Sequence, residues 1–137
     1  MPEKKTRERA RKARRQGKSA STQAGEFVRE EIHHIREGKH GARSPKQAIA
    51  IGLSKARRAG VKLRRPKPGT ASAETRKRAA RDTARGRRSG GRPSARRSRA
   101  TTRALQREGR EAAAPRALAR QARSAARKRR RPTRRGA

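Results

Sequence analysis

Cysteine, tryptophan and tyrosine are absent from the 137-residue sequence, and Phe27 is the single Phe, Trp or Tyr residue. Without cysteine there is no disulfide framework, no thiol nucleophile and no Cys-based zinc site, which is compatible with a reducing cytosol. Proteins that hold single strands without sequence preference normally stack bases on several aromatic side chains. The missing aromatic residues therefore count against single-stranded nucleic acid as the target.

Large apolar residues are also scarce. Val, Ile, Leu, Met and Phe together number 12, and nine of them lie between residues 27 and 63. The longest apolar run, residues 48–53, is far shorter than the roughly 20 residues that cross a bilayer. Any hydrophobic core is therefore expected within 27–63, and no membrane insertion is expected.

Acidic residues number only 10 against 45 Lys plus Arg, so the formal net charge is +35. Such an excess is typical of proteins that bind a polyanion. The excess is +7 in residues 1–18, +5 in residues 19–63 and +23 in residues 64–137. Charge and apolar residues are thus segregated along the chain.

Residues 45–59 carry the clearest helix signals. Ser44 is a suitable N-cap, Pro45 suits the first helical position, and Gln47 is placed to close a capping box. Gly60 suits the left-handed conformation that ends many helices. The pattern predicts a helix with both ends marked.

A second amphipathic helix is predicted over residues 23–37, with Ser21 or Thr22 as its N-cap and Gly38 after its last turn. The short connection makes the two helices antiparallel neighbours. The expected core of this hairpin consists of Phe27, Val28, Ile32, Ile35, Ile49 and Leu53.

The flanking regions hold too few large apolar side chains to fold alone. The predicted fold is therefore mostly disordered with a small all-α part: a disordered basic arm (1–22), a two-helix antiparallel hairpin module (23–63) and an Arg/Ala-rich tail (64–137). Within the tail, residues 73–85 and 116–131 are rich in Ala and Arg and are expected to become helical when phosphates relieve the charge repulsion.

The run Gln47-Ala48-Ile49-Ala50-Ile51-Gly52-Leu53-Ser54, with Gly25-Glu26-Phe27 before it, resembles a family of short basic bacterial proteins that share a small domain of unknown function. The resemblance covers about residues 23–63, implies a bacterial cytoplasmic origin and brings no assigned activity. The tail is similar to the basic tails of bacterial linker-histone-like proteins, with Arg in place of their usual Lys.

Lys and Arg side chains are the expected nucleic-acid contacts, because each neutralises a phosphate and releases counterions. Phosphate contacts carry no sequence information, so the predicted binding is nonspecific. DNA is favoured over RNA, because the helical pattern assigns Phe27 to the core. The candidate contact residues are Arg11, Arg14, Arg15, Arg57, Arg58, Arg64, Arg65, Arg85, Arg87, Arg88, Arg92, Arg96, Arg97, Arg127, Lys128, Arg129, Arg130 and Arg131.

Two short runs, Arg85-Gly86-Arg87-Arg88 and Gly91-Arg92-Pro93, each resemble part of the Arg-Gly-Arg-Pro core of AT-hooks. That core lies extended in the narrow minor groove of A·T-rich DNA. Neither copy is complete, and co-occurrence of Gly, Arg and Pro by chance in such a tail is the favoured interpretation.

His33, His34 and His40 could suggest a metal site, but no Cys and no HExxH spacing accompany them. We expect them on the surface or in hairpin packing, with no metal and no cofactor. Glu30 and Glu31 point apart on a helix and nothing suggests that they are buried, so a solvated acidic face is predicted. The alternative is that this face docks the basic arm or tail when DNA is absent.

The predicted function is nonspecific nucleic-acid binding by a cytoplasmic, nucleoid-associated accessory protein that neutralises DNA phosphates. One alternative is an RNA- or ribosome-associated protein. Another is an interaction module, in which the hairpin forms a homodimer or binds a partner protein and the basic tail only localises it. No catalytic residues are identified, because catalysis needs groups fixed on rigid supports, and an enzyme is not expected.

Overall fold

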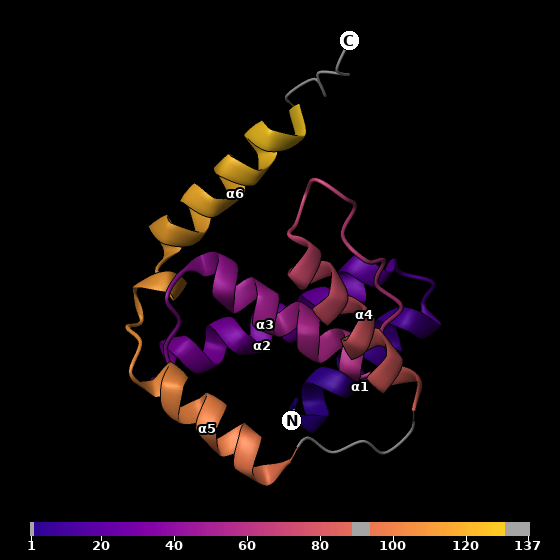
Figure 1. Cartoon of the computed structure of the whole chain (residues 1–137), viewed down its shortest axis with the longest axis horizontal. Coiled ribbons are helices and arrows are strands. Elements are labelled where there is room, and N and C mark those ends of the chain that lie inside the picture. The colour runs from indigo at the N-terminus through magenta and orange to yellow at the C-terminus, as the bar shows by residue number, and fades with distance from the viewer. Residues whose placement is uncertain (1, 89–93, 131–137) are drawn as a thin grey trace.

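The computed structural model describes residues 2–88 and 94–130, and these form six α-helices and one 3-10 turn (Figure 1). In chain order they are α1 (Lys4–Arg15), α2 (Ala20–Arg36), α3 (Pro45–Arg58), α4 (Ala73–Arg87), α5 (Ala95–Gln106), the 3-10 turn η1 (Glu111–Ala113) and α6 (Pro115–Arg130). The prediction of a mostly disordered chain with only a two-helix hairpin is therefore wrong. The hairpin helices exist as α2 and α3, but they are part of a larger helical structure.

The ends of α3 follow the sequence signals closely. Ser44 caps the helix by accepting a hydrogen bond from the backbone N–H of Gln47 at 3.2 Å, and Pro45 occupies the first turn. The Gln47 side chain accepts from the backbone N–H of Arg43 at 2.6 Å, one residue before the capping-box position. Gly60 follows the last turn with φ +97°.

Helix α2 begins earlier than the predicted residue 23. Ser19 is the N-cap, since its hydroxyl accepts from the backbone N–H of Thr22 at 3.3 Å, so the helix starts at Ala20. The predicted caps Ser21 and Thr22 lie inside the first turn. The C-terminal end is as expected, because Gly38 follows with φ +79°.

Helices α2 and α3 pack closely because α3 presents small residues to α2. Ala48, Gly52 and Ala56 recur every four residues along α3 and are all buried. A Cβ placed on Gly52 would lie 2.6 Å from the Cα of Val28. The two backbones therefore approach to a distance that only glycine at this position allows.

Most of the buried apolar residues form two clusters, one towards each end of the hairpin. The first contains Ala10, Ala24, Phe27, Ala56 and Val61, with Ala20, Leu53 and Leu63 packed against it. The second contains Ile35, Ala42, Ala48, Ala112 and Ala113, with Ile32 packed against it. Each cluster includes residues from outside the predicted hairpin core, so the hairpin is completed by other parts of the same chain.

Of the predicted hairpin core, Phe27 and Ile35 are fully buried, with 1% and 0% of their surface exposed. The other four residues, Val28, Ile32, Ile49 and Leu53, are half-buried. Alanines fill much of the remaining interior. A count of large apolar residues underestimated the core for this reason.

The basic arm is not disordered but forms α1, which packs against α2. Its buried residues Thr6, Ala10 and Ala13 are spaced i, i+4 and i+7, so they line one face of the helix. Because this face consists of small side chains, a count of large apolar residues does not register it. The hairpin surface supplies the rest of the contact that α1 could not provide alone.

The part of the chain from the end of α5 to η1 is also attached to the hairpin. The backbone N–H of Gly41 donates to Leu105 O at 2.8 Å, Ala42 N–H donates to Gly109 O at 3.1 Å, and Arg36 Nε donates to Ala113 O at 3.1 Å. These bonds join the end of α5, the segment after it and η1 to the end of α2 and the α2–α3 connection. All three bonds end on backbone carbonyl groups of this part of the chain. Amino-acid composition does not predict such bonds, because every residue has a backbone carbonyl.

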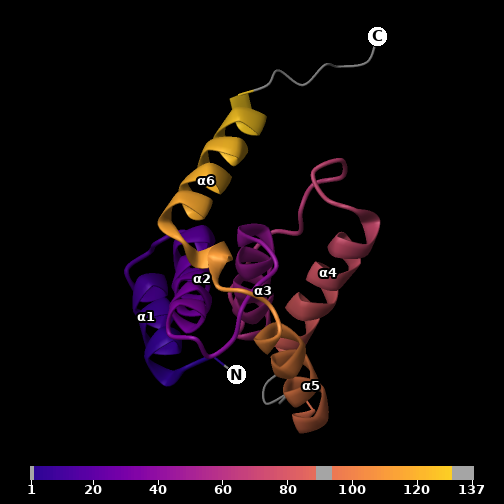
Figure 2. The same cartoon turned by 90° about the vertical axis from the view of Figure 1, so that its left-hand side faces the viewer.

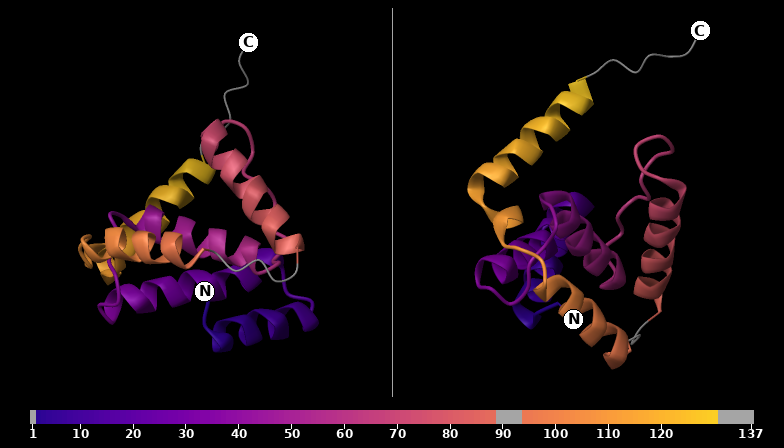
Figure 3. Two further views of the ribbon diagram at one scale, coloured as in Figure 1. Left: turned by 60° about the horizontal axis from the view of Figure 1, so that its bottom comes forward. Right: turned by 60° about the vertical axis from the view of Figure 1, so that its left-hand side comes forward.

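The two Ala/Arg-rich stretches predicted to be helix-permissive correspond to α4 and α6. Helix α4 lies against α3, where the Ser54 hydroxyl donates to Asp82 Oδ2 at 2.8 Å. Helix α6 follows η1, contacts α3, and then projects beyond α1–α3 (Figures 1 and 2). Two further views show α5 and α6 on the outside of the molecule (Figure 3).

Candidate functional sites

The projecting helix α6 combines a high positive charge with partial or full exposure of all its residues to solvent. Its 16 residues include seven Lys or Arg and no acid, and none of its residues is buried. Arg116, Arg120, Arg123 and Arg127 are spaced i, i+4, i+7 and i+11, so they share one face of the helix. At about 1.5 Å of rise per residue, this face presents four guanidinium groups over roughly 16 Å.

Helices α1 and α5 add to the basic surface. Helix α5 carries four Arg and no acid, and it too buries no residue. Helix α1 carries eight Lys or Arg and one Glu, with only Thr6, Ala10 and Ala13 buried. Lys5, Glu8, Arg9, Lys12 and Arg15 line a shallow depression on this helix.

Most of the predicted nucleic-acid contacts are exposed. Arg92 and Arg131 lie outside the described residues. Several exposed cations that the prediction omitted accompany them, including Lys4, Arg99 and Arg103. The exposed members of the predicted set are Arg11, Arg14, Arg15, Arg64, Arg65, Arg85, Arg87, Arg88, Arg96, Arg97, Arg127, Lys128, Arg129 and Arg130.

Arg57 and Arg58 do not belong to an exposed basic surface. Arg57 is buried, its guanidinium donates to Arg64 O at 3.1 Å, and burial lowers the pKa of Arg57. Arg58 is half-buried, with its Nε 3.9 Å from Asp82 Oδ1. Arg57 therefore links α3 to the segment that follows it, and Arg58 links α3 to α4.

The first AT-hook-like run is not extended, because Arg85, Gly86 and Arg87 lie in the last turn of α4. A Cβ on Gly86 would overlap the backbone of Arg57, so this glycine permits close packing of α4 on α3. The second run, Gly91-Arg92-Pro93, lies outside the described residues.

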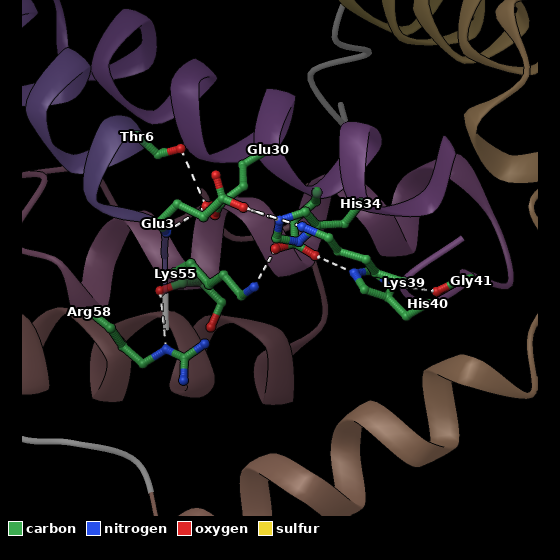
Figure 4. Close-up of polar contacts among 11 residues, drawn as sticks. Glu3, Thr6, Glu30, His34, Lys39, His40, Gly41, Lys55 and Arg58 are labelled. Atoms are coloured by element: carbon green, nitrogen blue, oxygen red, sulfur yellow. Dashed lines mark hydrogen bonds and ion pairs between the residues drawn. The ribbon is translucent and has the colours of Figure 1, made fainter. Parts of the chain in front are cut away.

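A buried polar cluster lies between α1, α2 and α3. Its central residue, Glu31, is 0% exposed, which contradicts the prediction of a solvated acidic face. Lys55 and His40, both labelled in Figure 4, approach its two oxygens: Lys55 Nζ pairs with Oε1, and His40 Nε2 lies 3.1 Å from Oε2. The carboxylate thus connects α2, α3 and their connection.

Glu30, beside it, joins α2 to α1. Glu30 Oε1 accepts from the backbone N–H of Glu3 at 2.5 Å and faces the Thr6 hydroxyl at 3.3 Å. An acidic residue of α2 therefore does hold the N-terminal segment, through a backbone N–H and a hydroxyl rather than through the Lys and Arg side chains of the arm.

Glu3 forms the outer edge of the cluster. Its Oε1 lies 3.1 Å from His34 Nε2 and 3.5 Å from Lys39 Nζ. The hydrogen bond with His34 holds the pKa of the Glu3 carboxyl below its ordinary value. Lys39 also pairs with Glu37, and that contact raises the pKa of Lys39.

The three histidines differ in their surroundings. His33 is exposed, whereas the side chains of His34 and His40 are only 14% and 10% exposed and their rings meet edge to face at 5.9 Å. His34 and His40 lie within the hairpin beside Glu31. Sequence reasoning did not predict that they meet there.

The helical pattern did contain a signal for the cluster. Glu31 lies four residues after Phe27 and four before Ile35, so it shares the buried face of α2 with both. A charged residue in register with buried apolar neighbours needs a partner. The partners come from α3 and the connection, which the sequence pattern of α2 alone could not identify.

Among residues 2–88 and 94–130, no helix is both long and apolar enough to cross a bilayer. Residues 4–67, which span α1, α2, α3 and the segment after them, match the model of a family described as "Family of unknown function (DUF6496)". This agrees with a small domain of unknown function, and the match begins well before residue 23. No curated protein and no solved structure matches the chain.

Proposed function

We propose that this protein binds nucleic acid without sequence preference, with duplex DNA favoured over RNA, through phosphate contacts made by α1, α5 and α6. The observation that carries the proposal is the state of α6: seven cations, no acid and no buried residue in 16 residues. A helix with this charge repels itself in isolation, and a polyanion removes that cost.

The contacts suit a phosphate backbone. An arginine guanidinium can grip a phosphate with two parallel N–H groups, and each neutralised phosphate releases counterions. The major groove of B-DNA is about 12 Å wide and admits an α-helix. The cluster Arg127, Lys128, Arg129 and Arg130 presents cations around the whole circumference of the last turn of α6, so it can reach both walls of a groove.

Duplex DNA is favoured because the described surface has no Phe, Trp or Tyr side chain on which bases could stack. Phe27, the single such residue of the chain, is 1% exposed and belongs to the core. The major groove of A-form RNA is too deep and narrow for side chains to read, which leaves less room for a helix. Together with the bacterial cytoplasmic origin that the family resemblance implies, the proposal assigns the protein a nucleoid-associated role.

The test is a salt series of binding by the full chain to duplex DNAs of equal length and different sequence, and to a structured RNA. We expect a log–log slope of about −0.9 for each phosphate neutralised and equal affinity for all the duplexes. Tighter binding to the RNA would reassign the target. Sequence preference among the duplexes, or a slope near zero, would overturn the mechanism.

A charge variant tests the role of α6. Replacement of Arg116, Arg120 and Arg123 by Gln should reduce the steepness of the salt dependence by about 3 units. The matched control replaces Lys77, Arg78 and Arg81 of α4 by Gln, which removes the same net charge from exposed positions. An equal loss in both variants would show that total charge, and not α6, governs binding.

A further inference from the structure

Three side chains in the buried polar cluster have the composition and spacing of a metal site. Glu31, His34 and His40 each offer one ligand atom, and these atoms all lie within 4.8 Å of one another. Two of the residues come from α2 and the third from the α2–α3 connection. Tertiary structure, and not a sequence motif, brings them together.

One oxygen of the Glu31 carboxylate lacks a hydrogen-bond partner. Glu31 Oε2 belongs to a fully buried side chain, yet no donor satisfies it. His40 Nε2 lies 3.1 Å away without hydrogen-bond geometry. Two donor atoms at this separation can both reach one ion, since Zn²⁺ binds imidazole nitrogen and carboxylate oxygen at about 2.0–2.2 Å.

Neighbouring residues hold the side chains of His40 and Glu31 in a form that can bind a metal ion. His40 Nδ1 lies 2.9 Å from the carbonyl oxygen of Gly41, and because a carbonyl only accepts, Nδ1 carries the proton. In the neutral ring Nε2 then presents a lone pair towards Glu31. Lys55 occupies the other carboxylate oxygen, Oε1, and leaves Oε2 for a ligand. Outer contacts of this kind orient metal ligands in many proteins.

We propose that Glu31, His34 and His40 bind one divalent transition-metal ion, with Zn²⁺ the best match. Two imidazoles and one carboxylate are ligands that zinc accepts, whereas Mg²⁺ and Ca²⁺ prefer oxygen atoms alone. Glu3 lies at the outer side of the site, where it hydrogen-bonds with His34. Glu3, Glu30 and His34 form a second set of potential metal ligands.

The ion would have a structural role. It would bind α2 to its connection beside the contact of Glu30 with α1. Lys39, Lys55 and the net charge of +35 oppose a cation here, so the affinity is expected to be lower than that of classical zinc-finger sites. This proposal does not depend on the proposed nucleic-acid binding.

The test uses the full chain without a histidine tag. Zn²⁺ is titrated by calorimetry, and Co²⁺ is titrated in parallel because its visible absorption reports the ligand geometry. We expect one ion per chain, d–d absorption bands from Co²⁺ and a rise in the unfolding temperature with Zn²⁺. Absence of binding to folded protein, or several weak equivalents, would overturn the proposal.

Variants locate the ion. His34→Gln and His40→Gln should each weaken Zn²⁺ binding at least tenfold and remove the Co²⁺ bands. His33→Gln is the matched control, because it removes an exposed neighbouring imidazole. Far-UV circular dichroism of each variant shows whether the helices persist. Unchanged binding in folded His34→Gln or His40→Gln, or an equal loss in His33→Gln, would refute the assigned site.

Discussion

Helices α2 and α6 have nearly the same length, 17 and 16 residues, and opposite relations to the rest of the molecule. Helix α2 buries five residues, two of them glutamates, and contacts α1, α3 and η1. Helix α6 buries none and carries seven cations without an acid. Helix α2 is therefore stabilised by packing against other helices, whereas α6 presents its cations to solvent.

The comparison indicates how a chain with a net charge of +35 folds. Three of its ten acidic residues lie in α2, and two of these, Glu30 and Glu31, are buried among groups from α1 and α3. These acids offset charge where helices meet. The remaining helices can then carry cations on exposed faces, where water screens their repulsion.

The largest expected difference between the two helices concerns their largest apolar residues. Phe27→Ala in α2 should lower the free energy of unfolding by about 3–5 kcal/mol, because it leaves a cavity in the first apolar cluster. Leu118→Ala in α6 should cost less than about 1 kcal/mol, because Leu118 is only half-buried. Urea denaturation measures both.

If Phe27→Ala fails to fold, Phe27→Leu keeps the comparison measurable, since it removes less volume. Similar costs for the changes at Phe27 and Leu118 would contradict the view that α2 alone of the two is held by burial.

Glycine replacement distinguishes close packing from free surface within the hairpin. Gly52→Ala should destabilise the protein by about 1–3 kcal/mol, because the new methyl group meets the backbone of Val28. Gly25→Ala is the matched control in α2, where a Cβ meets nothing within 4 Å, and it should stabilise by about 0.5–1 kcal/mol. Thermal unfolding of both variants gives the sign, and a neutral Gly52→Ala would disprove the close approach.

The smallest expected effect is Ala122→Gly in α6. This exposed helical position should change the free energy of global unfolding by less than about 0.5 kcal/mol, although it weakens the helix locally by about 1 kcal/mol. Hydrogen exchange should show faster exchange in α6 than in α2, and a further increase in α6 of the variant. Equal protection of the two helices would mean that α6 is stabilised by more than its own sequence.

Much of the hairpin could be predicted because its signals are local. Ser44, Pro45 and Gly60 mark the ends of α3, and the spacing of Phe27 and Ile35 marks the inner face of α2. Helix α1 was missed because alanine contributes little to a count of large apolar residues. An alanine face becomes a core only when another helix lies close against it, as the first apolar cluster shows for Ala10.

The sequence by itself determined the charge, the absence of cysteine, the helical periods and the caps of α3, because each depends on composition or on residues a few positions apart. Only the tertiary structure decided that α1 packs on α2, that Arg57 is buried, and that Glu31 meets His40 and Lys55. Those contacts join residues that are 9 and 24 positions apart for Glu31. Their existence depends on how closely the backbones approach, and the small side chains of α3, above all Gly52, set that distance.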